Sequence, residues 1–90
     1  MPSACNIRIT GQVHGVGFRH TCCRQARLLG VTGWVRNAAD GTVEIHAEGM
    51  ACAVEALIAW CHDGPSGAHV RDVQTNPAAE TKAVTFDVRF

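Results

Sequence analysis

Apolar and polar residues alternate in three stretches of the chain, with the two-residue period of a half-buried β-strand. These stretches are 5–10, 42–48 and 83–90. Their apolar positions are Cys5, Ile7 and Ile9, then Val43, Ile45 and Ala47, then Val84, Phe86, Val88 and Phe90. Two further segments, 31–37 (VTGWVRN) and 68–75 (AHVRDVQT), also favour strands, and the turn sequence AADG predicts a hairpin between 31–37 and 42–48. We therefore expect five strands.

A helical period of apolar residues replaces this alternation in two segments. Cys22, Ala26 and Leu29 recur at i, i+4 and i+7, and Gly30 follows at a position where glycine commonly ends a helix. The second segment runs over residues 51–62 and is stopped by GPSG, so its helix should end near Asp63. Its apolar stripe consists of Val54, Leu57, Ile58 and Cys61. The chain is thus predicted to contain two amphipathic helices.

The order of these elements is β-α-β-β-α-β followed by one more strand. With short connections, this order fits the ferredoxin-like split βαβ motif, an α+β sandwich in which two helices pack on one face of an antiparallel sheet. At 90 residues the chain has the size of one domain, so we expect a single domain over residues 1–90. In this topology the first and second strands run in the same direction, with the third antiparallel between them. The segment after the first strand, which contains Arg19, should therefore meet Asn37 at one edge of the sheet.

The segment GQVHGVGFRHT, which joins the first strand to the first helix, carries candidate chemistry. Its glycines Gly11, Gly15 and Gly17 allow positive φ, so successive N–H groups can converge on an anion, and the following helix directs its N-terminus to the same place. Arg19 adds a permanent cation whose planar fork suits phosphate oxygens. The candidate binding residues are His14, Gly15, Val16, Gly17, Phe18 and Arg19. Glycines at this spacing also serve purely structural turns, so the spacing by itself leaves a phosphate or carboxylate site and a simple turn both open.

Composition and motif spacing exclude several other classes of function. GVGFRH lacks the third glycine of the dinucleotide fingerprint and the lysine of a Walker sequence, so no nucleotide is implied. The formal net charge is +0, so the basic surface that supplies most nucleic-acid affinity is missing. No apolar run approaches the roughly 20 residues of a membrane span. The N-terminus MPSACNIRIT lacks the features of a secretory signal, and we expect a cytoplasmic protein.

The five cysteines are an odd number without paired C-x-x-C spacing, which predicts neither a disulfide framework nor a zinc site. We interpret most of them as buried reduced thiols. Cys5 begins the first strand and Cys52 follows the third, and these two strands are antiparallel neighbours in this topology. The two cysteines could therefore approach and oxidise, although a cytoplasmic location favours two thiols. Cys22 and Cys23 follow Arg19 within the helix, whereas a cysteine phosphatase places its cysteine before the phosphate-binding glycines. Covalent catalysis is therefore disfavoured.

Two motifs resemble the signatures of the acylphosphatase family. GQVHGVGFR, residues 11–19, is similar to the family's G-x-V-x-G-V-G-F-R, and GWVRNAADGTVEIHAEG, residues 33–49, is similar to its second signature. The resemblance implies a ferredoxin-like fold and a hydrolase that cleaves the carboxyl–phosphate bond of acyl phosphates without a metal or other cofactor. By position, it implies that Arg19 binds the phosphoryl group with the loop amides and that Asn37 holds the attacking water. We expect a monomer that acts on a small-molecule acyl phosphate and releases inorganic phosphate, with no nucleic-acid or membrane partner.

The sequence departs from the common family pattern at His14, where glutamine is usual. If this position contributes mainly its backbone amide, activity should survive the difference. If the imidazole faces the site, its protonation should strengthen phosphate binding below about pH 6.5. Arg36 neighbours Asn37 but points to the opposite face of the strand, so we expect it to be solvated. The remaining histidines lack metal-ligand spacing and are expected to be at the surface or half-buried; they are His20, His46, His62 and His69.

A non-catalytic module is the alternative interpretation. One version is an acylphosphatase-like domain of a larger hydrogenase-maturation protein, which would continue into cysteine-rich zinc motifs, whereas this sequence ends on a predicted strand. Another is a ferredoxin-like RNA-binding domain, which needs exposed aromatic residues on its central strands. The sequence contains no tyrosine, three phenylalanines and no net positive charge. We therefore favour the enzyme.

Overall fold

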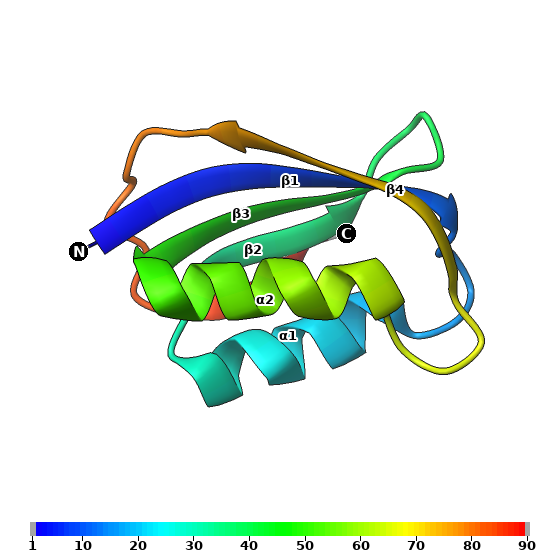
Figure 1. The fold of residues 1–90 in the computed structure, drawn as a ribbon, viewed down its shortest axis with the longest axis horizontal. Coiled ribbons are helices and arrows are strands. Elements are labelled where there is room, and N and C mark those ends of the chain that lie inside the picture. Colours follow the sequence, from blue (N-terminus) through cyan, green and yellow to red (C-terminus); the bar gives the residue numbers. More distant parts are fainter. Residues whose placement is uncertain (1, 90) are drawn as a thin grey trace.

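The structure, a computed structural model, describes residues 2–89 and contains two helices and five strands within them. In chain order the elements are β1 (Pro2–Gln12), α1 (Phe18–Leu29), β2 (Thr32–Asn37), β3 (Val43–Met50), α2 (Ala51–Asp63), β4 (His69–Pro77) and β5 (Phe86–Arg89). The predicted order of elements is confirmed. Both helices lie side by side on one face of the sheet (Figure 1). This is the expected ferredoxin-like sandwich.

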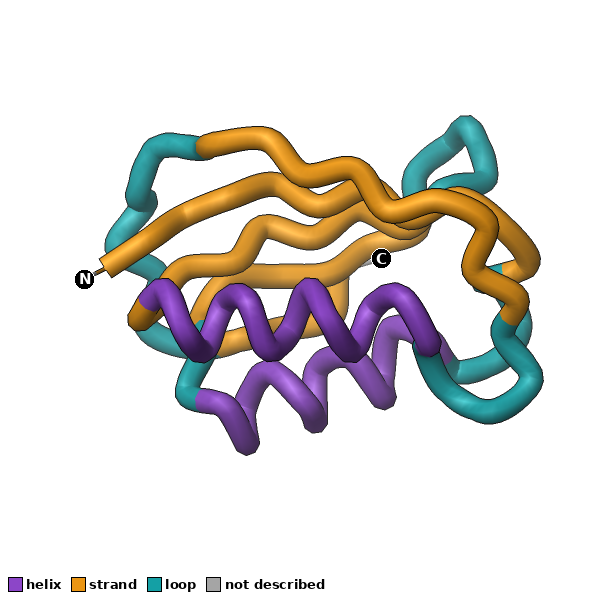
Figure 2. The backbone as a smooth tube through the Cα atoms, viewed as in Figure 1, coloured by secondary structure: helices purple, strands orange, loops and turns teal. Residues whose placement is uncertain are grey.

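The strands form one sheet in the order β4-β1-β3-β2-β5. β3 lies between β1 and β2 and is antiparallel to both, so β1 and β2 run in the same direction, as expected. The sheet is mixed rather than wholly antiparallel, because β5 pairs with β2 in parallel. Residues 78–85 carry the chain from β4 at one edge of the sheet to β5 at the other edge (Figure 2).

The sequence pattern misplaces the start of the last strand, which is predicted at residue 83 but begins only at Phe86. α1 begins at Phe18, inside the glycine-rich segment. Val84 is predicted to share the buried face of the last strand, but it is 87% exposed because it lies in the connection before β5. Phe90, the last residue of the same predicted face, lies outside the described residues.

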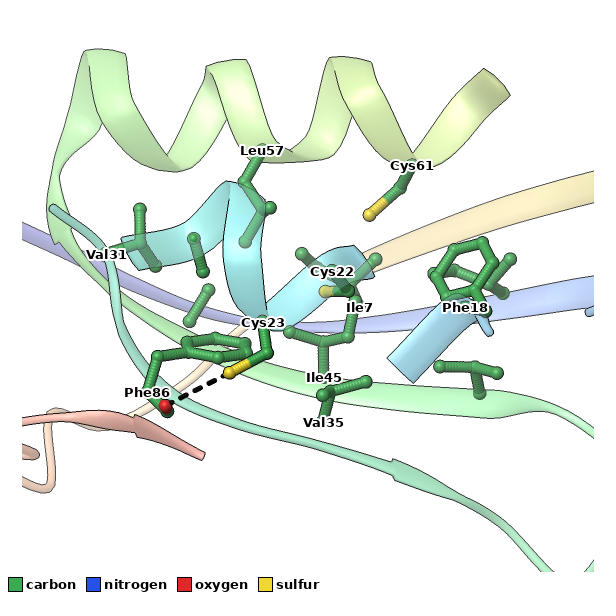
Figure 3. Packing of buried hydrophobic residues seen from close by; sticks show 14 of the residues in the cluster. Ile7, Phe18, Cys22, Cys23, Val31, Val35, Ile45, Leu57, Cys61 and Phe86 are labelled. Atoms are coloured by element: carbon green, nitrogen blue, oxygen red, sulfur yellow. Dashed lines mark hydrogen bonds between the residues drawn. The ribbon is translucent and has the colours of Figure 1, made fainter. Parts of the chain in front are cut away.

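The apolar core lies between the helices and the inner face of the sheet. Phe18 at the start of α1 and Phe86 at the start of β5 are its largest fully buried side chains. Ile7, Ile45 and Val35 come from the three neighbouring strands β1, β3 and β2 and face the helices (Figure 3). Burial of this apolar surface is the main favourable contribution to folding, and it fixes the helices over the sheet.

The cysteines are free thiols in the structure, and three of them, Cys22, Cys23 and Cys61, are buried. A hydrogen bond with Cys61, together with burial, raises the pKa of the Cys22 thiol well above its ordinary value. The Sγ of Cys23 donates to the backbone oxygen of Phe86 at 3.3 Å (Figure 3). Both thiols therefore contribute to core packing. Cys5 is half-buried and Cys52 is exposed.

The outer face of the sheet buries a histidine, contrary to the expectation of a surface or half-buried residue. His46 is only 5% exposed. Its ring stacks on Trp34 with centroids 6.0 Å apart, and its Nδ1 lies 3.1 Å from Oδ1 of Asn6. Its Nε2 lies 2.7 Å from Oε2 of Glu48. The alternation of polar residues along β3 correctly assigns His46 to the outer face but does not reveal that this face is covered.

Glu48 holds the connection 78–85 to β3. Its carboxylate accepts hydrogen bonds from the backbone N–H groups of Thr81 and Lys82 at 3.0 and 3.1 Å, and from the hydroxyl of Thr81. Burial raises the pKa of this carboxyl, but the hydrogen bonds from Thr81 and His46 outweigh burial and lower the pKa from 4.5 to about 2. The connection is thus tied to the sheet by a carboxylate that stays charged in mild acid.

We expect this tie to make the protein lose stability in acid. Since the pKa of Glu48 is lower in the folded state than the unfolded value of 4.5, its stabilisation is fully present above that value and is lost as the pH falls toward about 2. Glu48→Gln should lower the free energy of unfolding by about 1–3 kcal/mol near neutral pH, with a smaller difference in acid. Urea unfolding across this pH range measures both effects, and the exposed Glu80→Gln is the matched control. A difference between wild type and Glu48→Gln that stays constant with pH would contradict the prediction.

Candidate active site

The segment between β1 and α1 forms a loop whose glycines adopt the left-handed conformation. Gly15 and Gly17 both have a φ of 74°. A Cβ at either position would meet no atom within 4 Å, so backbone conformation rather than crowding favours glycine there. Gly17 directly precedes α1, whose N-terminus has no side-chain cap and no acidic residue in its first turn. Within the described residues, this end of the helix is therefore suited to bind an anion.

Two buried side chains anchor the ends of this loop in the core. Val13 is 1% exposed and Phe18 is 2% exposed, and the ring of Phe18 packs on Trp60 with centroids 5.3 Å apart. Between these anchors, His14, Gly15 and Gly17 are exposed and Val16 is half-buried. Because its side chain faces the core, Phe18 can offer a ligand its backbone N–H but not its ring.

Arg19 reaches from the start of α1 to the end of β5. Its side chain is half-buried, and its Nη1 donates to the backbone oxygen of Arg89 at 3.3 Å. Arg89 lies opposite Arg36 in the parallel pairing of β5 with β2, and Asn37 is the next residue of β2. The strand register thus brings the guanidinium of Arg19 to the end of the sheet at which β2 finishes with Asn37.

Asn37 is exposed at the last position of β2. It lies opposite Val43 of β3, and Val43 lies opposite Ile9 of β1. One row across the sheet therefore joins the end of β2 to β1 shortly before the glycine loop begins. The predicted meeting of the loop with Asn37 at one edge agrees with this register.

The turn 38–42, which follows Asn37, is held by a set of hydrogen bonds. The N–H of Ala38 donates to the oxygen of Thr42 at 2.8 Å. Oδ1 of Asp40 accepts from the N–H and the hydroxyl of Thr42 at 3.1 and 2.6 Å. These bonds from Thr42 are the main reason that the pKa of Asp40 is lowered. Nη1 of Arg8, in β1, donates to Oδ2 of Asp40 at 2.7 Å, so the turn is fixed to the neighbouring strand.

The sequence interpretation missed this turn as part of the site. An aspartate two residues before a threonine is a recognisable signal of an Asx turn, and the segment Asp40–Thr42 carries that signal. The pairing of Asp40 with Arg8 has no comparable signal, because the two residues are 32 positions apart and meet only through the sheet.

His14 makes the second contact that the sequence did not indicate. Its Nε2 lies 3.2 Å from the backbone oxygen of Thr42. The side chain therefore extends from the glycine loop to the turn that follows Asn37. No residue pattern could have revealed this contact, because its acceptor is a backbone carbonyl and not a side chain.

Arg36 lies on the outer face of the sheet, away from the helices. Its guanidinium forms an ion pair with Glu44 at 2.6 Å and lies over the ring of Trp34, 5.5 Å from the centroid. Its side chain is 50% exposed. The expectation that Arg36 is solvated agrees with this position.

Within residues 2–89, no group of three or more His, Cys, Asp or Glu side chains could hold a metal ion. Neither described helix is both long and apolar enough to cross a membrane.

Comparison with known proteins gives matches over nearly the whole chain. The sequence model of the acylphosphatase family matches residues 5–88. An acylphosphatase from Nocardioides sp. strain JS614 is 48% identical over 89 residues, which are 99% of this chain and 90% of that protein. The structure of an acylphosphatase from Coxiella burnetii has a TM-score of 0.94 and 32% identity, covering 98% of this chain and 93% of that one. A structure of full-length HypF in a phosphate- and nucleotide-bound form has a TM-score of 0.93 and 27% identity, but the match spans 12% of that longer chain.

Proposed function

The chain belongs to the acylphosphatase family, enzymes that hydrolyse acyl phosphates, and we propose that it works without a metal ion. In this proposal Arg19 and the loop amides hold the phosphate, and Asn37 holds the attacking water. The substrate is a small-molecule acyl phosphate, and the products are a carboxylate and inorganic phosphate. We further propose that residues 1–90 act as a single-domain monomer in the cytoplasm.

The glycine loop supplies the phosphate-binding half of the proposed site. The left-handed conformations of Gly15 and Gly17 let successive N–H groups from His14 to Arg19 turn toward one point. The N-terminal end of α1 adds a partial positive charge at the same place. The guanidinium of Arg19 offers planar donors to the equatorial phosphate oxygens, where charge lies in a loose phosphoryl-transfer transition state.

Asn37 supplies the water-binding half. The observation that carries the proposal is the hydrogen bond from Arg19 to Arg89, because Arg89 lies beside the end of β2 where Asn37 stands. The side-chain oxygen of Asn37 can accept a hydrogen bond from water without adding a negative charge beside the phosphate. Holding water and phosphate in one geometry turns a bimolecular attack into a step within the complex, which lowers its entropic cost.

The leaving group explains why the proposed site needs no general acid. A carboxylic acid has a pKa of about 4, so the carboxylate departs unprotonated. The oxygen of water forms a new bond to phosphorus while the bond between phosphorus and the carboxyl oxygen breaks, and the carboxylate keeps the electron pair. The proton of the attacking water passes to a phosphate oxygen of the substrate.

The proposal predicts that benzoyl phosphate is hydrolysed at the same rate with and without EDTA, since no step uses a metal ion. Phenyl phosphate is the control substrate, because phenol has a pKa of about 10 and leaves poorly without a proton. Its hydrolysis should be slower by several orders of magnitude. Release of inorganic phosphate measures both reactions. Loss of activity in EDTA that is restored by a divalent metal would contradict the metal-free proposal.

A further inference from the structure

The backbone oxygen of Thr42 is a shared acceptor between the two halves of the site. It accepts the N–H of Ala38 at 2.8 Å and lies 3.2 Å from Nε2 of His14. Ala38 directly follows Asn37, and His14 begins the run of phosphate-binding amides. A carbonyl oxygen has two lone pairs and can accept both bonds. The backbone oxygen of Thr42 therefore connects the turn that follows Asn37 to the phosphate-binding loop.

This shared oxygen belongs to a well-fixed residue. Thr42 is 9% exposed, and its N–H and hydroxyl both donate to Oδ1 of Asp40. Asp40 in turn is paired with Arg8 of β1 at 2.7 Å. The N–H of Gly41 donates to the oxygen of Ala38 at 3.1 Å and closes the turn. The anchor that His14 contacts is thus held from β1 as well as from within the turn.

The glycine loop has an exposed middle part between two buried ends. Its ends are fixed by the buried Val13 and Phe18, but His14 and the left-handed Gly15 and Gly17 between them are exposed. Glycine has the largest backbone freedom of any residue, so holding this segment in one conformation has an entropic cost. The His14 contact ties the exposed part of the loop to the rigid turn.

We propose that His14 is a positioning residue, which sets the distance between the phosphate held by the loop and the water held by Asn37. This inference rests on the proposed function and assigns His14 a role in the relative placement of the two reactants. Because a carbonyl oxygen can only accept, Nε2 of His14 carries the hydrogen and the ring donates. A glutamine side chain also ends in an N–H donor, so it can make the same contact.

The test compares His14→Ala with His14→Gln, using benzoyl phosphate as substrate and inorganic phosphate as inhibitor. In His14→Ala, kcat should fall about 10- to 100-fold because the reactants are misplaced by a fraction of an ångström to about 1 Å. The inhibition constant of phosphate should stay within about threefold, because Arg19 and the loop amides remain. His14→Gln should keep kcat near the wild-type value. The exposed His62→Ala is the matched control, and urea unfolding confirms that each variant is folded.

A double-mutant cycle separates this role from a direct action on the phosphate. If His14 acts through the water held by Asn37, then adding His14→Ala to Asn37→Ala should lower kcat by less than about threefold more. An unchanged kcat in His14→Ala, an equal loss in His14→Gln, or fully additive losses would each overturn the inference. An unchanged kcat in Asn37→Ala would instead overturn the proposed function itself.

The ring of His14 provides a second measurement that does not depend on activity. Nitrogen NMR of the folded wild-type protein above the titration of its histidines should show the hydrogen of His14 on Nε2 rather than on Nδ1. The opposite tautomer would overturn the proposed contact, since an unprotonated Nε2 cannot donate to the oxygen of Thr42.

Discussion

Arg19→Ala is expected to lower kcat/KM for benzoyl phosphate by about 10³-fold or more and to abolish inhibition by inorganic phosphate at concentrations that inhibit the wild type. The substitution removes a permanent positive charge and a planar set of donors from the proposed phosphate site. The loop amides remain, but neutral N–H groups form weaker hydrogen bonds to phosphate than a guanidinium does. Steady-state kinetics with phosphate as a competitive inhibitor measures both effects.

Two further variants sharpen this result. Arg19→Lys keeps the charge but loses the planar fork, so it should recover only part of the lost affinity. Arg24→Ala removes an exposed arginine from the same helix. It should leave kcat/KM and the inhibition constant of phosphate near the wild-type values. If Arg19→Ala were inhibited by phosphate as strongly as the wild type, Arg19 would not be the phosphate-binding cation.

Asn37→Ala is expected to lower kcat by about 10²- to 10³-fold while phosphate inhibition changes little. The variant still has Arg19 and the loop amides, so it should bind the phosphoryl group, but under the proposed mechanism the attacking water would no longer be held in position. A loss confined to kcat therefore distinguishes this residue from Arg19, whose loss should also weaken binding. Steady-state kinetics with inorganic phosphate as inhibitor measures kcat and the inhibition constant separately.

The controls for Asn37 test charge and location. Asn37→Asp keeps the size of the side chain but adds a negative charge beside the phosphate, so it should weaken substrate binding as well as turnover. Asn76→Ala changes an exposed asparagine of β4 and should have no effect on kcat. An active Asn37→Ala would remove the water-positioning role from the mechanism.

Much of the fold follows from the spacing of apolar residues. The two-residue period of β1 and β3 and the helical period of Cys22, Ala26 and Leu29 predict the elements, because burial of one face depends on that period. The order of elements then restricts the topology, which places the loop of Arg19 and the end of β2 at one edge. These are local patterns combined with a rule of connection, and both can be seen in a single sequence.

The predictions that were wrong, and the contacts that the sequence did not reveal, depend on the packing of distant segments. His46 is buried because Trp34 and Glu48 pack against it and residues 78–85 lie against Glu48, and nothing in the alternation along β3 shows where that connection runs. Val84 is exposed although it fits the apolar period of the last strand, because the parallel pairing with β2 begins only at Phe86. The contact between His14 and Thr42 is equally long-range, and its acceptor is a main-chain atom.

The strand order also has a consequence for how the enzyme folds. β1 must find both β3 and β4, and the hydrogen bond from Arg19 to Arg89 joins residues 70 positions apart. Pairing such distant segments requires the closure of long chain loops, and the entropic cost of that closure comes before any stabilising contact forms, which favours slow folding. The β2–β3 hairpin joins neighbouring segments and can form early. Arg19 and Asn37 share an edge only after β1 and β2 have both paired with β3. Recovery of turnover during refolding therefore marks the completion of the sheet and not the first appearance of secondary structure.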